Sequence, residues 1–196
     1  MRIGFLASHG GSGMRAVVQA IRAGSLAAEA AAAISNNSAA PALAFAREAG
    51  IPRYHLSAAT HPVPEELDAA IRDALVRHGA DVVLLSGYMK NAGPLVRAAF
   101  RGRMLNIHPA LLPRFGGEGM YGDRVHRAVL AARVPVTGAT VHVIDEVYDH
   151  GPILRQREVP VLAGDTVETL RERVMAAEAA LIVDVLRDVV AGQLQL

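Results

Sequence analysis

The chain contains no cysteine. This excludes disulfide bonds, thiolate nucleophiles and cysteine-ligated metals, and it fits a cytoplasmic protein. The chain also lacks a large excess of charge of either sign: its formal net charge at pH 7 is +1. The composition therefore points to neither a nucleic-acid partner nor an anionic membrane. No stretch approaches the roughly 20 apolar residues of a membrane helix. The apolar start, Met1–Leu6, is too short for a signal peptide and predicts a first strand.

What is present is the composition of a globular protein: of the 196 residues, 52% are hydrophobic and 20% are charged. That length predicts a single domain over residues 1–196. Short apolar runs alternate with longer helical segments, which predicts an α/β fold with a mostly parallel central sheet and helices on both faces. The predicted strands are Ile3–Ala7, Val82–Ser86, Met104–Ile107, Thr140–Ile144 and Ile153–Val159. The predicted helices are Met14–Ala23, Ala40–Ala49, Pro64–His78, Ala92–Phe100, Asp123–Ala132 and Val167–Ala191, the last preceded by Asp165-Thr166 as an N-terminal signature.

Two segments are ambiguous. Ala27–Ala33 is so rich in alanine that intrinsic propensity favours a helix. A parallel sheet needs a strand after each crossover, however, so we predict that this segment is a strand. Gly116–Gly122 is too dense in glycine for either element. It predicts either a mobile lid or a rigid, irregular loop.

A glycine-rich segment, Ser8–Gly13, follows the first predicted strand. Glycines let the backbone approach an anion closely, and unpaired amides at the start of the next helix favour negative charge. The spacing matches neither the phosphate loop that ends in Gly-Lys-Ser/Thr nor the dinucleotide fingerprint. The presumed second strand also leads into Ile34–Asn37 without an acidic ribose ligand. A single phosphate is therefore favoured over a dinucleotide, with a plain tight turn as the alternative.

Polar side chains alternate at the end of a later predicted strand. Asn106 and His108 lie two residues apart, so both would face the same side of the sheet. Pro109 cannot donate to a ladder and ends the strand. An amide and an imidazole at the carboxyl end of a parallel strand suit an acyl-type reaction, because both can donate to an oxyanion and the imidazole can move a proton. The alternative is a pair of hydrogen-bonded core residues.

An acidic turn, Asp145–Pro152, follows the predicted strand Thr140–Ile144. Acidic residues in turns are commonly solvated turn formers. The functional alternative requires one carboxylate to reach His108, whose charged form it would favour. No pair of residues has defensible metal-ligand spacing. We predict surface or packing roles for His55, His61, His78 and His142.

Taken together, these motifs resemble a known family. The glycine-serine loop is followed, in order and over nearly the whole chain, by Leu85–Lys90, Asn106–Pro113, Val125–Leu130, Gly138–His142 and Asp149–Leu154. The pairing of Asn-x-His-Pro-x-Leu-Leu-Pro with Asp-x-Gly-Pro is highly specific to folate-dependent formyltransferases. The chain therefore resembles this family, and within it the glycinamide ribonucleotide formyltransferases of purine synthesis.

The resemblance implies one Rossmann-like formyltransferase domain, with an N-terminal part that binds the ribonucleotide phosphate and a C-terminal part that binds folate and carries the catalytic residues. It implies transfer of a formyl group from 10-formyltetrahydrofolate, the co-substrate, to the amine of glycinamide ribonucleotide, with no metal. Asn106 and His108 would bind the formyl oxygen, while Asp149 would sustain a charged His108 and relay protons. The substrate would be bound by Gly11, Ser12, Gly13 and Glu178. Folate would be bound by Met89, Lys90, Asn91, Ala92, Asn106, Ile144, Asp145, Glu146 and Val147.

The chain departs from the family pattern mainly on the substrate side. His9 and Gly13 replace the first glycine and the asparagine of the family's Gly-x-Gly-Ser-Asn loop. The arginine that many members carry is not evident around Thr60–Glu66, and Phe115–Arg124 is longer than in the shortest members. Family members often carry two histidines in that region, and this chain has a counterpart of one of them, His126.

Four other functions stay open. A formyltransferase for another amine, such as an amino sugar, would use the same catalytic residues. A methionyl-tRNA formyltransferase would carry a further C-terminal domain, and a formyltetrahydrofolate hydrolase a further N-terminal domain, which disfavours both. A non-catalytic folate-binding or nucleotide-binding module would have no reason to keep Asn106, His108 and Asp149 together. We expect small-molecule partners only, with a homodimer left open.

Overall fold

The computed structural model describes all 196 residues and divides into two compact units, Met1–Leu105 and Asn106–Leu196. Its strands form one seven-stranded sheet in the order β3-β2-β1-β4-β5-β6-β7. β1 pairs in parallel with β2 and β4, β2 pairs in parallel with β3, and β6 pairs antiparallel with β7. The predicted α/β class with a mostly parallel sheet is therefore confirmed. No helix combines the length and the apolar character needed to cross a membrane.

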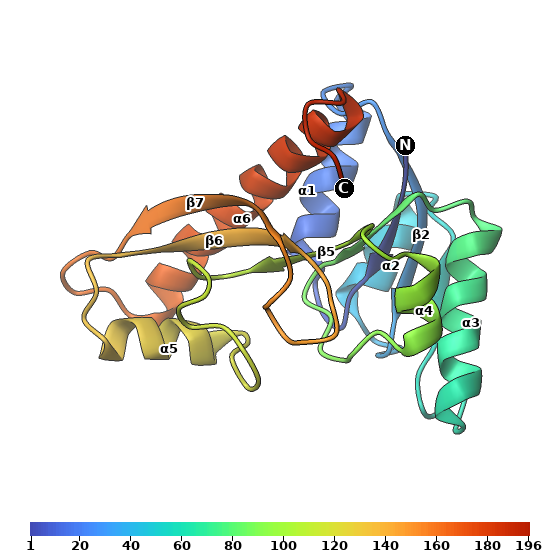
Figure 1. Cartoon of the computed structure of the whole chain (residues 1–196), viewed down its shortest axis with the longest axis horizontal. Coiled ribbons are helices and arrows are strands. Elements are labelled where there is room, and N and C mark those ends of the chain that lie inside the picture. Colours follow the sequence, from blue (N-terminus) through green and yellow to red (C-terminus); the bar gives the residue numbers. More distant parts are fainter. The chain divides into compact units, whose positions relative to one another are not determined.

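The first unit alternates strands and helices (Figure 1). Its elements are β1 (Arg2–Leu6), α1 (Ser12–Arg22), β2 (Glu29–Ser35), α2 (Pro41–Glu48), β3 (Arg53–His55), α3 (Pro64–Arg77), β4 (Val82–Leu85) and α4 (Pro94–Ala99), and it contains the start of β5 (Met104–His108). All four residues of β4 are buried, as the continuous apolar run predicted for a strand covered on both faces. The alanine-rich segment is strand β2, so sheet topology outweighs helix propensity there.

The direction in which the chain crosses the sheet explains where the helices lie. From β1 the chain moves outward to β2 and β3, and it then returns to β4 on the other side of β1. Because parallel crossovers are right-handed, this reversal puts the α1 and α2 crossovers on one face and the α3 crossover on the other. α1 accordingly packs beside α2, and α3 beside α4. The loops after β1 and β4 thus meet at a topological switch point, where open α/β sheets bind ligands.

The second unit contains the rest of β5, then α5 (Asp123–Ala131), β6 (Val136–Val143), β7 (Ile153–Pro160) and α6 (Val167–Val190). α6 runs along the β6–β7 hairpin and packs on both strands and on α5 (Figure 1). The core of this unit is an apolar cluster that includes Val125, Val129, Leu170 and Val174. α6 begins at the predicted signature, where Thr166 accepts a hydrogen bond from the Thr169 amide and Thr169 Oγ1 accepts one from the Thr166 amide.

Several boundaries differ from the sequence prediction. α1 begins at Ser12, so Ser12 and Gly13 form its first turn instead of a loop. β6 begins at Val136, before the predicted Thr140, because pairing with β7 extends to Val136. α4 begins at Pro94, so Ala92 precedes the helix. β3 was missed, since three residues are too few to show a period.

Candidate active site

The two loops at the switch point of the first unit are joined by Ser8. Its Oγ accepts a hydrogen bond from the Met89 amide at 2.7 Å and donates one to Asn36 Oδ1 at 2.6 Å. The Ser8 amide in turn donates to the Gly87 carbonyl at 3.1 Å. The glycine-rich loop after β1 is therefore fixed to Gly87–Ala92, the segment that contains the predicted folate contacts Met89–Ala92.

The start of α1 has the features of an anion site. Its N-cap, Gly11, has no side chain to cap the helix, and the first turn contains no acidic residue. The first amides of a helix have no partner within it and lie at the positive end of its dipole. Met14 is the exception here, because its amide donates to Ser86 Oγ at 3.0 Å. The backbone at Gly11, Ser12 and Gly13 can thus hold a phosphate or carboxylate.

Gly11 is required at this position by its backbone. Its φ is +62°, a conformation that side chains strongly disfavour. A Cβ there would also lie 3.2 Å from Ala42 Cβ. The tight approach of α1 to α2 and the turn that exposes the amides therefore both depend on this glycine.

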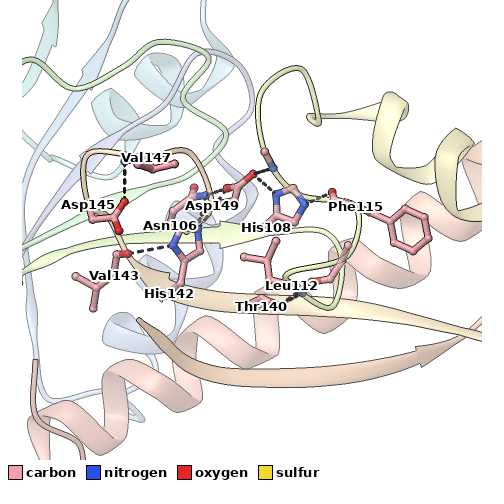
Figure 2. A network of polar contacts seen from close by, with 12 residues as sticks. Asn106, His108, Leu112, Phe115, Thr140, His142, Val143, Asp145, Val147 and Asp149 are labelled. Carbon is pink, nitrogen blue, oxygen red and sulfur yellow. Dashed lines mark hydrogen bonds and ion pairs between the residues drawn. The ribbon is translucent and has the colours of Figure 1, made fainter. Parts of the chain in front are cut away.

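A polar cluster lies in the second unit, where β5 and the loop after β6 bring three predicted residues together (Figure 2). Asn106 and His108 project from the same side of β5, and Asp149 comes from the loop. Asp149 Oδ2 lies 3.4 Å from His108 Nδ1, and Asn106 Nδ2 lies 3.4 Å from Asp149 Oδ1. The His108 side chain is 4% exposed and that of Asp149 10%, so solvent does little to screen their interaction.

The loop after β5 adds two backbone groups to the cluster. His108 Nε2 donates to the Phe115 carbonyl at 2.7 Å. The Gly117 amide donates to Asp149 Oδ2 at 3.0 Å. The glycine-dense segment Gly116–Gly122 is an irregular loop of bends and turns that contacts Asp149 through the backbone amide of Gly117.

Both ring nitrogens of His108 face acceptors. The Phe115 carbonyl can only accept, so Nε2 carries a proton, and only the doubly protonated ring can also donate from Nδ1 to Asp149. Burial acts against that form and lowers the pKa of His108, while the Asp149 carboxylate and the Phe115 hydrogen bond oppose this shift. The charge on His108 thus depends on Asp149.

Asp149 shows the complementary behaviour. Burial alone would raise its pKa, but contacts with His142, His108 and the Gly117 amide outweigh burial and lower it. The donors Asn106 Nδ2, His108 Nδ1 and Gly117 N all converge on this one carboxylate. Donors arranged around one small space can stabilise a negatively charged oxygen, and the carboxylate beside them can accept a proton.

The local sequence explains how these loops reach the site. Asp149 has φ 55° and Phe115 has φ 59°, so both partners of His108 adopt the left-handed conformation. Such strain is typical of functional sites. Gly151 is required because a Cβ there would overlap the Val143 carbonyl as the loop returns to β7. This close approach accounts for the glycine of the Asp-His-Gly-Pro motif.

The strand end at His108 is fixed by Thr140 of β6. Thr140 Oγ1 donates to the Ala110 carbonyl at 2.6 Å and accepts from the Leu112 amide at 3.1 Å. Gln156 of β7 donates to the same hydroxyl and to the Leu112 carbonyl, both at 2.9 Å. The segment that follows His108 is thereby anchored to the neighbouring hairpin.

Other predicted site residues lie outside the cluster. Asp145 accepts from the Val147 amide at 2.8 Å and pairs with His150 at 3.0 Å, so it stabilises its own turn and does not reach His108. Within that turn Val147 is 60% exposed.

Glu178 lies on α6, partly buried and without a hydrogen bond or ion pair, and desolvation raises its pKa to about 8. No three acidic or histidine side chains are grouped to hold a metal ion.

The sequence prediction gave His142 a surface or packing role; the structure excludes the surface role, because His142 is 2% exposed, and it places the side chain in the cluster. Its Nε2 lies 3.1 Å from Asn106 Nδ2 and 3.5 Å from Asp149 Oδ1. The signal that could have found it is its place at the carboxyl end of an apolar strand, just before the acidic turn. The Phe115 carbonyl and the Gly117 amide were also missed, because backbone groups leave no trace in residue identity.

The fold agrees with comparisons to known proteins. The formyl transferase family model matches residues 1–186. The chain belongs to this formyl transferase family.

The chain is also similar to individual proteins of known name or known structure. The chain is 40% identical over 184 residues to the chloroplastic phosphoribosylglycinamide formyltransferase of Vigna unguiculata, covering 94% of this chain but 59% of that protein. The crystal structure of glycinamide ribonucleotide transformylase 1 from Symbiobacterium toebii superposes with a TM-score of 0.93 at 38% identity, covering 100% of this chain and 90% of that one. A formyltetrahydrofolate deformylase from Pseudomonas syringae superposes with a TM-score of 0.88 at 25% identity, covering 100% of this chain and 63% of that one. The chain thus spans less than two thirds of the length of the first curated relative.

Proposed function

We propose that this protein transfers a formyl group from 10-formyltetrahydrofolate to the amine of glycinamide ribonucleotide. The observation that carries the proposal is the cluster around Asp149. Its two carboxylate oxygens lie 3.4 Å from His108 Nδ1 and 3.4 Å from Asn106 Nδ2. Similarity to phosphoribosylglycinamide formyltransferases supports this substrate pair.

The reaction needs three events: attack on the formyl carbon, cleavage of its bond to folate, and transfer of a proton. The amine nitrogen of the nucleotide attacks this carbon, and the carbonyl electrons move onto its oxygen, which becomes a tetrahedral oxyanion. Asn106 Nδ2 donates a hydrogen bond to that oxygen, and the charged His108 donates a second from Nδ1, whose contact with Asp149 is long at 3.4 Å. The oxyanion then collapses, the bond to the folate nitrogen breaks, and the amine proton passes to that nitrogen through Asp149 or water.

The two substrates use different segments. Gly11, Ser12 and Gly13 would hold the ribonucleotide phosphate with backbone amides, since Gly13 cannot supply the side-chain amide of the family's asparagine. The family resemblance assigns the folate contacts to Met89–Ala92, Asn106 and Ile144–Val147, largely through the backbone. A single formyltransferase domain over residues 1–196 is part of the same proposal.

Gly11→Ala should raise KM for the nucleotide by on the order of tenfold, the equivalent of about 1.4 kcal/mol, with kcat changed less. The reason is the loss of the left-handed turn that exposes the helix amides. Steady-state kinetics with the nucleotide varied measures this. Gly24→Ala is the matched control: its φ of +71° imposes the same backbone strain at the other end of α1, in open space. Equal KM changes in both variants would contradict a phosphate role for the loop.

Glu178 would contact the ribose of the substrate. Because its pKa is raised from 4.5 to about 8, the folded protein keeps a proton that the unfolded chain loses, and stability falls as pH rises through that window. Glu178→Gln should therefore flatten the decline of Tm between pH 4.5 and about 8 and raise KM for the nucleotide. The exposed Glu172→Gln on the same helix should leave the wild-type slope. Parallel Tm profiles for wild type and Glu178→Gln would refute the raised pKa.

An absorbance assay of folate product with glycinamide ribonucleotide as acceptor, beside a control without acceptor, tests the function. Product that depends on the acceptor supports the proposal. Equal product without acceptor indicates a formyltetrahydrofolate hydrolase, the second candidate favoured by the likeness to the deformylase. Product with an amino sugar alone indicates another amine acceptor, and ligand binding without product indicates a non-catalytic module.

Compartment and assembly belong to the same proposal. The absence of cysteine is the observation that favours the cytoplasm. Sedimentation equilibrium decides between a monomer and the homodimer that the family resemblance leaves open.

A further inference from the structure

Both ring nitrogens of His142 have partners within the second unit (Figure 2). Nδ1 lies 3.1 Å from the Val143 carbonyl, and Nε2 lies 3.1 Å from Asn106 Nδ2. The carbonyl can only accept, so the proton of the neutral ring is on Nδ1. Nε2 then presents a lone pair to the Asn106 amide, which lies at 3.1 Å and can only donate, whereas the carboxylate oxygen Asp149 Oδ1 lies farther away, at 3.5 Å.

This lone pair fixes the orientation of the Asn106 side chain. The two ends of an amide have similar shape but opposite hydrogen-bonding character, because the oxygen accepts and the nitrogen donates. A lone pair on His142 Nε2 selects the nitrogen. Asp149 Oδ1 selects the same end, but its contact with Nδ2 is longer, at 3.4 Å. His142 is therefore the nearer acceptor for Asn106.

Amide orientation matters for the reaction proposed above. Asn106 Nδ2 carries two protons, and His142 holds one of them. The other is directed at Asp149 through the long contact and can be released to a substrate oxygen. With the amide turned over, Asn106 would present an acceptor to the forming oxyanion and repel it.

We propose that His142 is a positioning residue whose neutral ring, protonated on Nδ1, holds the Asn106 amide with its nitrogen ready to donate to the formyl oxygen. This inference rests on the proposed formyl transfer. His142 acts through Asn106 and need not touch the substrate.

Two substitutions separate this role from packing. His142→Leu fills the space but removes the acceptor. His142→Gln retains an oxygen that can accept from Asn106. We expect His142→Leu to lower kcat on the order of tenfold, the usual scale for one hydrogen bond, with both KM values within about twofold of wild type. We expect His142→Gln to recover most of that kcat.

A double-mutant cycle shows which residue His142 acts through. In an Asn106→Ala background, His142→Leu should reduce kcat by less than about twofold, because the group it positions is gone. A full, multiplicative loss in that background would overturn the proposal, as would a His142→Gln variant no more active than His142→Leu. Circular dichroism and Tm confirm that each variant is folded.

The tautomer is read without any turnover. Nitrogen-15 NMR of the free protein, with His142 assigned through its loss in His142→Gln, should show a proton on Nδ1 and none on Nε2. A proton on Nε2 overturns the proposal whatever the activity. If the wild type formylates no nucleotide while Nδ1 carries the proton, the proposed function fails and the positioning of Asn106 by His142 stands.

Discussion

Asn106→Ala should lower kcat by on the order of 10²–10³, the usual cost of removing one oxyanion donor. Asn106 Nδ2 is the side-chain amide that the cluster places beside the His108–Asp149 pair, 3.4 Å from Asp149 Oδ1 and 3.1 Å from His142 Nε2. The donor acts most strongly on the transition state, where the oxygen carries charge, so KM for either substrate should change far less than kcat. Steady-state kinetics with each substrate varied in turn measures this split.

Asn106→Asp sharpens the test. It keeps the size of the side chain but replaces the donor with a second carboxylate beside Asp149, so kcat should fall at least as far as in Asn106→Ala. If Asn106→Asp were close to wild type, a donor at this position would not be needed, and the oxyanion role of Asn106 would be wrong. Thermal unfolding of both variants checks that the β5 strand end remains folded.

Much of the fold could be predicted because its signals are local and periodic. The four apolar residues of β4 and the amphipathic segments of α3 and α6 each show their element within a short window. The alanine-rich β2 required an argument from topology, since its composition favours a helix. β3 was missed because three residues are too few to show a period, and the early start of β6 because it depends on pairing with β7, which leaves no local pattern.

The candidate site likewise combines residues that a local pattern predicts with groups that no local pattern reveals. Asn106 and His108 could be placed together because residues two apart on a strand share a side. The approach of Asp149 to these two residues was expected from the family resemblance alone, since no spacing rule joins residues 43 positions apart. The carbonyl of Phe115 and the amide of Gly117 could not be found at all, because any residue supplies those groups. The place of His142 in the cluster could not be predicted either, because it depends on the approach of Asn106 from another strand.

Asp149→Asn should lower kcat by about 10²–10⁴, the range for a group that moves a proton in the transition state, and should also change the pH profile. The carboxylate raises the pKa of His108 against the effect of burial, so without it that pKa falls further. The charged His108 needed for the oxyanion is then lost at a lower pH. As the pH is raised, the residual activity of the variant should therefore begin to decline at a lower pH than the activity of the wild type does.

Two measurements keep these effects apart. A proton NMR titration of His108 follows its charge without turnover and should show the midpoint moving to lower pH in Asp149→Asn. Glu158→Gln is the matched control, because it removes an exposed carboxylate from β7 of the same unit and should leave kcat and the His108 midpoint unchanged. A folded Asp149→Asn protein with near-wild-type turnover would remove Asp149 from the mechanism. An unmoved His108 midpoint would instead show that burial and the Phe115 carbonyl alone determine the protonation of His108, and Asp149 would then act only on the amine proton.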